Sequence, residues 1–517
     1  MTGLNQTSML RVAPSARWPI LIALAGLAAA APLWVSQLLP FQDVPQHIAA
    51  IRILADWGAS TNHFRHWFEL DFARSQYLGV YLPGALLARF IGPSAACRVL
   101  LSLIALSFPA ACWMLLGSFN RDRRLAIFAP LIFHSSVSYI GLFGFVASVP
   151  ATAVIVALIE RELQAPRRSR ALLIAAGTIC ILYLHVTGVA LAAGAALVLG
   201  ATSRLPWRRV ARALIPLAPA LLLLGVWAIR APPPEPTDAA THASGPYWQP
   251  FLQQLLDVGR LGNVLVGRLD EIFIGALLAV FLAIALFPFS PAAPREFVSA
   301  SFGDRLRARR LPILAAALFA AYLVSPVGVG HVWLIHLRFL PLLALVAIAV
   351  PVTARRRATS VLLGAALVLE LGYACVLVNR YRAFDLEAQP AELKQVLEAA
   401  KPGGRLIGII MNQESQIFHF KPYMHFALYY EVLRGGRSRF NFGELPWMPL
   451  RFRHDVGATP FPPNWEWDPG ELSWERIAHD ADYVLVRGDV PPPASRFTLK
   501  RRAGIWSLYE PAPALPR

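Results

Sequence analysis

The residues best suited to chemistry lie in the segment 41–47, Phe-Gln-Asp-Val-Pro-Gln-His, which follows the first long apolar stretch of the chain. Asp43 supplies a carboxylate and His47 an imidazole. Because Pro45 favours an extended residue before it and a helix after it, we predict that Asp43 starts a helix that ends near Trp57 and lies along a membrane surface. A carboxylate held there can act as a general base or a metal ligand. The simpler interpretation is an acidic residue favoured by the helix dipole.

Two histidines, His134 and His185, lie inside long apolar stretches, where a polar ring needs a partner or water. The sequence Val-Thr-Gly follows His185 and predicts a reversal between two helices, which would bring this imidazole beside the first loop. A simple turn between two short helices explains Gly188 equally well.

Three further candidates, His331, His336 and Arg338, lie within the segment 325–341. The segment begins with Ser-Pro-Val-Gly-Val-Gly, and Arg338 falls just inside the apolar stretch that follows. An arginine in that place can bind a lipid phosphate, or merely extend its side chain to the headgroups.

The composition of the chain is that of a membrane protein. Of its 517 residues, 56% are hydrophobic and only 15% charged, and the mean hydropathy is +0.50, far from the values of an ordinary soluble domain. The four cysteines all lie in apolar stretches and form no Cys-x-x-Cys motif, so neither a disulfide framework nor a cysteine metal site is predicted. We therefore expect a polytopic α-helical membrane protein.

About twenty apolar residues cross a bilayer as a helix, and we count about eleven such segments, several of them short enough to be tilted or broken. The first lacks the small-residue cleavage pattern of a signal peptide, so we expect it to be retained as an anchor. The predicted spans are 18–39, 95–117, 125–140, 141–160, 171–185, 187–201, 213–229, 271–289, 311–325, 335–353 and 358–378.

Arginine-rich linkers predict the orientation. They lie near residues 121–124, 161–170, 204–212, 305–310 and 355–357, and all fall on one side of the membrane if the spans alternate. Because cytoplasmic loops are enriched in Arg and Lys, we predict a cytoplasmic N-terminus and an extracytoplasmic C-terminus in a bacterial plasma membrane. The net charge of +17 is then mostly a topogenic signal and gives no reason to expect nucleic acid as a partner.

This topology divides the chain into a spanning region, residues 1–378, and a C-terminal region, residues 379–517. Two outer loops interrupt the spanning region, at 40–94 and 231–270. Apolar strand patterns and a Gly-Gly turn predict that the C-terminal region is a small extracytoplasmic α/β domain. All twelve histidines then lie outside the spans or in the outer half of one, although short, arginine-filled cytoplasmic linkers explain part of that distribution.

Together these features predict an outward-facing cavity at membrane depth that contains a carboxylate, several imidazoles and an arginine. Such a set suits attack by a hydroxyl group on a sugar linked to a lipid phosphate. The carboxylate would deprotonate the acceptor, and cations or a metal would neutralise the charge on the leaving phosphate. The polyprenyl tail of the donor would lie in the bilayer.

In its first span, its Asp-bearing first outer loop (Asp43 to His47), its many further spans and its outer C-terminal region, the chain resembles the GT-C class of integral membrane glycosyltransferases. The resemblance implies transfer of a sugar from a polyprenyl-phosphate donor to a glycan, lipid or protein acceptor. It implies that Asp43 is the catalytic base or a metal ligand, with His47 supporting it. A divalent cation, Mg or Mn, would bind at these two residues if the reaction uses one.

The remaining candidate residues extend this picture. The groups expected to bind the donor phosphate are Arg338, His331, His336, His185 and His134. Many members of the class carry a second acidic residue close to the first, whereas here the next acidic candidates are Glu69 and Asp71. The Trp-Trp-Asp triplet of the oligosaccharyltransferases is absent from the C-terminal region of the sequence.

Two other functions stay open at the level of sequence. A transporter or flippase of a lipid-linked substrate also uses broken spans and intramembrane polar residues, but the two halves of this chain show no correspondence. A non-catalytic GT-C-like protein that binds a lipid-linked sugar is the other alternative. Substitution of Asp43 would separate that protein from an enzyme.

Overall fold

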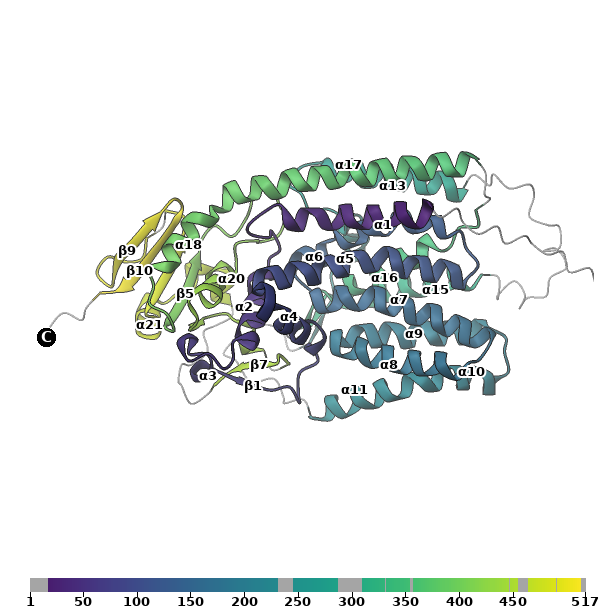
Figure 1. Ribbon diagram of the computed structural model, residues 1–517, viewed down its shortest axis with the longest axis horizontal. Helices are drawn as coiled ribbons and strands as arrows, with labels where there is room; N and C mark the ends of the chain where they lie inside the picture. Colours follow the sequence, from purple (N-terminus) through teal and green to yellow (C-terminus); the bar gives the residue numbers. More distant parts are fainter. Residues whose placement is uncertain are drawn as a thin grey trace, which may run out of the picture.

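Long helices run side by side through most of the chain, and a region of short strands and helices covers one end of the bundle (Figure 1). The computed structural model describes residues 17–230, 245–286, 309–330, 332–353, 357–445, 447–453, 464–489 and 491–512. The candidate His331 and parts of the linkers at 305–310 and 355–357 therefore lie outside the described residues.

Six helices of the described residues are long and apolar enough to cross a membrane. They are α1 with η1 (Arg17–Trp34), α5 (Pro93–Ser118), α7 (Phe143–Gln164), α10 with α11 (Trp207–Arg230), α13 (Leu269–Leu286) and α17 with α18 (Arg357–Glu398). The shorter helices of the bundle are α4 (Leu78–Ile91), α8 (Arg168–Leu184), α9 (Val186–Thr202), α15 (Arg310–Val324) and η7 with α16 (His336–Ile348). The chain is thus mostly helical, with fewer membrane-length helices than the eleven predicted spans.

The predicted span 125–140 is wrong as a continuous helix. This stretch forms three short pieces, η3 (Arg123–Phe128), η4 (Pro130–Phe133) and α6 (Ser136–Ile140). It still passes from one end of the bundle to the other, because Arg124 lies over the ring of Trp18 and the carbonyl of Ile140 accepts from the N–H of Asp43. Irregular backbone is tolerated at membrane depth only where protein surrounds it, and most of this stretch is buried.

The described arginine linkers gather at one end of the bundle, here called the arginine end. Arg310, at the start of α15, forms an ion pair with Glu160 near the end of α7 through two contacts of 2.6 and 2.5 Å. Arg209 donates to the carbonyl of Gln164 at 2.5 Å, which joins α10 to the end of α7. Helix α2 (Val44–Ala55), which Asp43 directly precedes, lies toward the opposite end, here called the Asp43 end (Figure 1).

The C-terminal region contains a five-stranded sheet in the order β6-β5-β8-β10-β9. The strands are β5 (Arg405–Ile410), β6 (Arg437–Ser438), β8 (Tyr483–Arg487), β9 (Phe497–Ala503) and β10 (Trp506–Pro511). Strand β5 runs parallel to both neighbours, whereas β10 is antiparallel to β8 and β9. Alternate residues of β5 serve two cores, since Leu406 and Ile410 pack toward the helices of the bundle and Ile407 and Ile409 pack toward α21 (Trp474–Asp480).

The first loop packs against the C-terminal region and pairs with one of its strands. Its strand β1 (Phe68–Leu70) pairs antiparallel with β7 (Leu450–Phe452), so that Glu69 lies opposite Arg451. The helix that follows Asp43, α2 (Val44–Ala55), is almost entirely buried and packs against α4, α5 and α19 (Tyr429–Arg434). Protein thus covers this helix on nearly every side, and its expected position along a membrane surface stays a prediction.

The Glu160–Arg310 pair gives a stability prediction. In Arg310→Ala, the fully buried Glu160 carboxylate loses both contacts with the Arg310 guanidinium, whereas its hydrogen bond from Gln164 stays. Loss of one partner of a buried pair costs about 3–5 kcal/mol, so we expect a clear fall in the midpoint of thermal unfolding of the purified protein in detergent.

The matched control is Lys394→Ala, which breaks the exposed Lys394–Glu398 pair of α18. Exposed pairs contribute about 0–1 kcal/mol, so this midpoint should stay close to that of the unsubstituted protein. Equal midpoints for the two variants would show that the Glu160–Arg310 pair does not stabilise the fold as a buried ion pair.

Candidate functional site

Asp43 is held in place by the turn that joins α6 to α7. Its backbone N–H donates to the carbonyl of Ile140 at 3.2 Å, and its own carbonyl accepts from the N–H of His47 at 3.1 Å. Gly141 lies against it with φ of +110°, and a β-carbon at this glycine would be 2.4 Å from the β-carbon of Asp43. Only a glycine allows the two backbones to approach so closely.

The Asp43 carboxylate contacts an imidazole from the C-terminal region. His425, in the segment between β5 and α19, places Nε2 at 3.1 Å from Asp43 Oδ1. The other ring nitrogen, Nδ1, lies 2.7 Å from Oε1 of Glu466 in α20 (Asn464–Trp467). Both contacts need an N–H on the ring, so His425 is an imidazolium between two carboxylates.

The electrostatics support this protonation state. Burial of the His425 ring opposes its charge, but the carboxylates of Glu466 and Asp43 outweigh burial and raise the pKa of His425 to about 10. The pKa of Glu466 is raised above its usual value, because burial outweighs the opposing charge and hydrogen bond of His425, and the nearby Asp43 carboxylate adds to the rise. The three side chains form a group whose charged forms stabilise one another, here called the Asp43–His425–Glu466 triad.

Gln46 joins the triad to the rest of the C-terminal region. Its Nε2 donates to the carbonyl of Phe440 at 2.5 Å and lies 3.1 Å from His425 Nδ1, and its Oε1 accepts from the N–H of Phe442 at 2.9 Å. The Phe442 ring in turn packs edge-on against the rings of both His47 and His425. Gln46, in the first turn of α2, therefore fixes the segment 440–442 beside the triad.

His47 has a positioning role in this arrangement. Its Nε2 lies 2.8 Å from the carbonyl of Gly141, and its Nδ1 lies 2.9 Å from the hydroxyl of Tyr81. Burial lowers the pKa of His47, so the ring is neutral, with Nε2–H donating and Nδ1 accepting. With both nitrogens bonded, His47 fixes the Gly141 turn against α2 and α4 and has no free nitrogen for a substrate or a metal.

A second polar cluster brings together two of the predicted phosphate-binding residues, Arg338 and His185. Arg338 is buried, and its Nη1 lies 3.4 Å from His185 Nε2 and 3.3 Å from the hydroxyl of Thr187. His185 accepts the N–H of Thr187 at Nδ1, which fixes the proton on Nε2 and leaves the ring neutral. Arg338 Nη2 donates to the carbonyl of Trp333 at 3.0 Å, and its buried Nε has no hydrogen-bond partner among the described residues.

Two tyrosines of one helix turn connect this cluster to the triad. Tyr77 precedes α4, and its hydroxyl lies 3.4 Å from His185 Nε2. Tyr81, four residues later, contacts His47. The first turn of α7 lies between the two groups, since Phe143 packs on His47 and Phe145 packs on His185. Asp43 and Arg338 thus lie at the same end of the bundle, on either side of this turn.

The other predicted residues lie elsewhere. His134 is a core histidine, because its Nε2 lies 2.8 Å from the carbonyl of Ala29 and its Nδ1 lies 3.3 Å from the Tyr139 hydroxyl. His336 is buried beside Asp257, with Nε2 at 3.8 Å from Oδ2. The two acidic candidates lie at the β1–β7 pair, where Glu69 is opposite Arg451 and Asp71 contacts Arg451 and Arg74 at 3.6 and 3.7 Å.

Sequence reasoning missed the two partners of Asp43. His425 is one of twelve histidines and has no distinguishing neighbour in the sequence, and Glu466 lies between two tryptophans in no recognisable motif. Neither has a spacing that relates it to Asp43, because the contact depends on how the C-terminal region docks onto α2.

The arrangement does not suit a divalent cation. Among the described residues, no group of three or more His, Cys, Asp or Glu side chains is arranged to hold a metal ion. At Asp43 the positive charge is supplied by the His425 imidazolium, and both nitrogens of His47 are bonded to protein. The expected Mg or Mn ligands, Asp43 and His47, therefore do not form a metal site.

Comparison of the chain with models of known protein families and with curated proteins finds no match. The resemblance to the GT-C class thus continues to rest on Asp43 and on the order of the spans and loops.

The contact at Gly141 gives a prediction. In Gly141→Ala, the added methyl group would overlap Asp43, and the positive φ would be strained. We expect the midpoint of thermal unfolding to fall by the equivalent of about 1–3 kcal/mol or more. The matched control is Gly194→Ala in α9, where a β-carbon meets nothing within 4 Å, and a helical alanine there should be neutral or stabilising. A Gly141→Ala midpoint equal to that of the control would show that the turn does not pack on Asp43 as described.

The triad gives a pH dependence. The pKa of His425 rises from 6.5 in the unfolded chain to about 10 in the fold, so its stabilising effect is fully present below pH 6.5 and is lost as the pH rises through 10. We expect the difference in unfolding midpoint between the unsubstituted protein and His425→Gln to be constant below pH 6.5 and to shrink steadily above it. The measurement is thermal unfolding in detergent across this range, and a difference independent of pH would contradict the assigned imidazolium.

Proposed function

We propose that the chain is a GT-C-type membrane glycosyltransferase with about eleven passes, some of them short or broken. In this proposal it transfers a sugar from a polyprenyl-phosphate donor to an acceptor hydroxyl on a glycan, lipid or protein. The Asp43 end faces outward from a bacterial plasma membrane, and the N-terminus is cytoplasmic. The observation that carries the proposal is the Asp43–His425–Glu466 triad at the same end of the bundle as the buried cation Arg338.

Asp43 is the catalytic base of the proposed reaction. His425 occupies Oδ1, whereas no group of the described residues bonds to Oδ2, which leaves that oxygen to accept a proton. The acceptor hydroxyl gives its proton to Asp43 Oδ2 while its oxygen bonds to the anomeric carbon of the sugar. The bond from that carbon to the phosphate oxygen breaks, and the electron pair leaves with the polyprenyl phosphate.

His425 and Glu466 are positioning residues. The N–H of His425 Nε2 fixes the rotation of the Asp43 carboxylate, and Glu466 fixes the imidazolium from the other side. A carboxylate that is already oriented loses less entropy when the acceptor binds. The proposed chemistry thus depends on residues from both the first loop and the C-terminal region.

Arg338 is the proposed partner of the leaving phosphate. It is an arginine that is 8% exposed, and among the described residues it has no carboxylate partner. A buried guanidinium without a counter-ion is costly and is stabilised when an anion binds. The Thr187 hydroxyl and the Trp333 carbonyl accept hydrogen bonds from Arg338 and orient it, and the Tyr77 hydroxyl nearby is a further hydrogen-bonding group for the phosphate.

Asp43→Asn is expected to lower the rate of sugar transfer by at least about 10²–10⁴-fold, because an amide cannot take the acceptor proton. The assay measures radiolabel moved from a panel of polyprenyl-phosphate sugars to endogenous acceptors in membranes with matched expression. The control is Asp56→Asn at the other end of α2, which removes the charge of a partly exposed pair with Arg52 and alters a 3.4 Å contact with Asn62.

The alternatives predict other outcomes in this assay. A transporter or flippase would move the lipid-linked sugar across the membrane without forming a labelled product, and a non-catalytic binding protein would give no label with any donor. Unchanged transfer by Asp43→Asn would remove Asp43 from the reaction.

Arg338→Ala is expected to raise the KM for the donor by about tenfold or more, since a charge-assisted contact to phosphate is lost. Initial rates at varied donor concentration measure the effect. The control is Arg74→Ala, which removes a half-exposed guanidinium paired with Asp71 at the same end of the bundle. A donor KM equal to that of the control would mean that Arg338 is only a structural contact of α9.

A further inference from the structure

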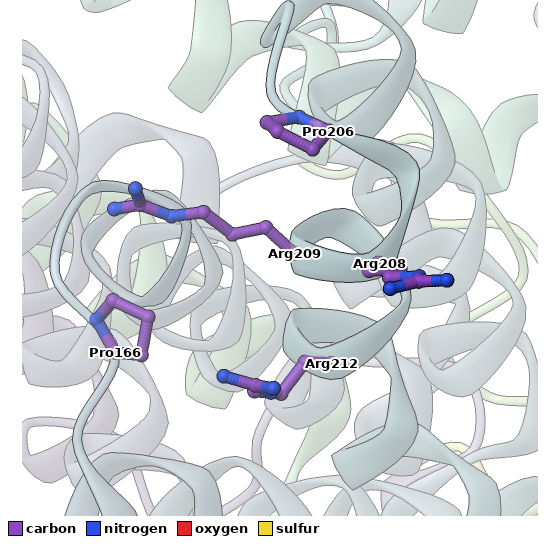
Figure 2. A pocket seen from close by; sticks show the side chains of 5 residues that line it. All are labelled: Pro166, Pro206, Arg208, Arg209 and Arg212. Carbon is purple, nitrogen blue, oxygen red and sulfur yellow. The ribbon is translucent and has the colours of Figure 1, made fainter.

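A basic depression lies at the arginine end of the bundle, far from the triad. It has a volume of about 370 Å³ and is lined by Pro166, Pro206, Arg208, Arg209 and Arg212 (Figure 2). Arg209 and Arg212 extend from α10 toward Pro166, which lies in the linker between α7 and α8 (Figure 2). Three of the five lining residues are arginines and none is acidic.

The carboxylates nearest to this depression are engaged by other arginines. Glu160 is held by Arg310, and Glu162 pairs with Arg170 at 3.5 Å. Within the described part of the chain, no ion pair joins an arginine of the depression to an acidic side chain. Arg209 donates from Nη2 to a backbone carbonyl, while its Nε is buried with no hydrogen-bond partner in that part of the chain. The arginines that line the depression therefore have no counter-ion among the described residues.

The surroundings of the depression are those of a lipid boundary. Trp207 begins α10 and is 73% exposed, and Ile215 and Leu222, which follow toward α11, are 65% and 71% exposed. On the other side of α10, Val210 and Leu214 pack against the core of the bundle. An exposed tryptophan beside arginines, followed by an exposed apolar helix, is typical of a helix that meets headgroups at one end and acyl chains along its side.

We propose that the depression binds the phosphate-bearing headgroup of an anionic membrane lipid, with the acyl chains lying along α11. The arginines supply charge-assisted hydrogen bonds to the phosphate, and the anion relieves the repulsion among them. A lipid fits this site better than a soluble phosphate because the basic surface continues directly into the exposed apolar face of α11. The site is separate from the proposed transfer chemistry, which lies at the other end of the bundle.

The test titrates phosphatidylglycerol into the purified full chain in phosphatidylcholine mixed micelles and follows the midpoint of thermal unfolding. The depression variant carries Arg208→Gln, Arg209→Gln and Arg212→Gln. The matched control removes the same number of charges from β9, at the Asp43 end, through Lys500→Gln, Arg501→Gln and Arg502→Gln. We expect the apparent dissociation constant for phosphatidylglycerol to rise about tenfold or more in the depression variant and to stay unchanged in the control.

Other results would overturn the proposal. Equal constants for the unsubstituted protein and the depression variant, or equal losses in both triple variants, would show that charge acts non-specifically. Inorganic phosphate in pure phosphatidylcholine micelles should give no stabilisation. Stabilisation by inorganic phosphate that the depression variant lacks would assign the site to a soluble anion and overturn the lipid assignment.

If the triple variant does not fold, Arg212→Gln alone decides the question, because this side chain is exposed and makes no hydrogen bond within the described chain. It should weaken phosphatidylglycerol binding about threefold or more without lowering the midpoint in pure phosphatidylcholine. An unchanged constant in this variant would contradict the proposal.

Discussion

A protonated imidazole held between two carboxylates is the interaction on which the Asp43 end of this molecule depends. His425 can keep its charge under burial only while Asp43 and Glu466 both lie within contact distance. These two carboxylates come from the first loop and from the far part of the C-terminal region. The C-terminal region must therefore pack closely against the start of α2, so that the His425 imidazolium contacts the Asp43 carboxylate.

The rest of the junction follows from that requirement. Gln46 bonds to the backbone on either side of Asn441, and β1 pairs with β7, so the docking is made by directional hydrogen bonds as well as by apolar contact. Gly141 has no side chain and so allows the α6–α7 turn to pack directly against Asp43, and the hydrogen bond between His47 Nε2 and the Gly141 carbonyl holds that turn in position. The first turn of α7, which follows, contacts both His47 and His185, and this gives the proposed base and the proposed phosphate partner fixed places relative to each other.

The sequence predicts the features of this structure that depend on local patterns of apolar and polar residues. Apolar length predicts most of the helices, and the type and place of Asp43 mark it as a candidate. Arg338 and His185 were both expected at one edge of the bundle, and the structure brings them into contact. The segment 125–140 was misjudged because composition cannot distinguish a lipid-facing helix from broken backbone shielded by other helices. The partners of Asp43 were missed for a related reason, since they depend on long-range docking that leaves no periodic signal.

The measurement that tests the account most directly is the rate of sugar transfer by His425→Gln, in which Asp43 itself is intact. If the C-terminal region completes the site, saturating rates should fall about a hundredfold or more while the KM for the donor stays near its original value, because orientation of the base is lost and donor binding is not. Glu466→Gln should show the same pattern to a smaller extent. Full transfer rates in His425→Gln, with the protein folded and inserted, would contradict the claim that the triad is the reaction centre.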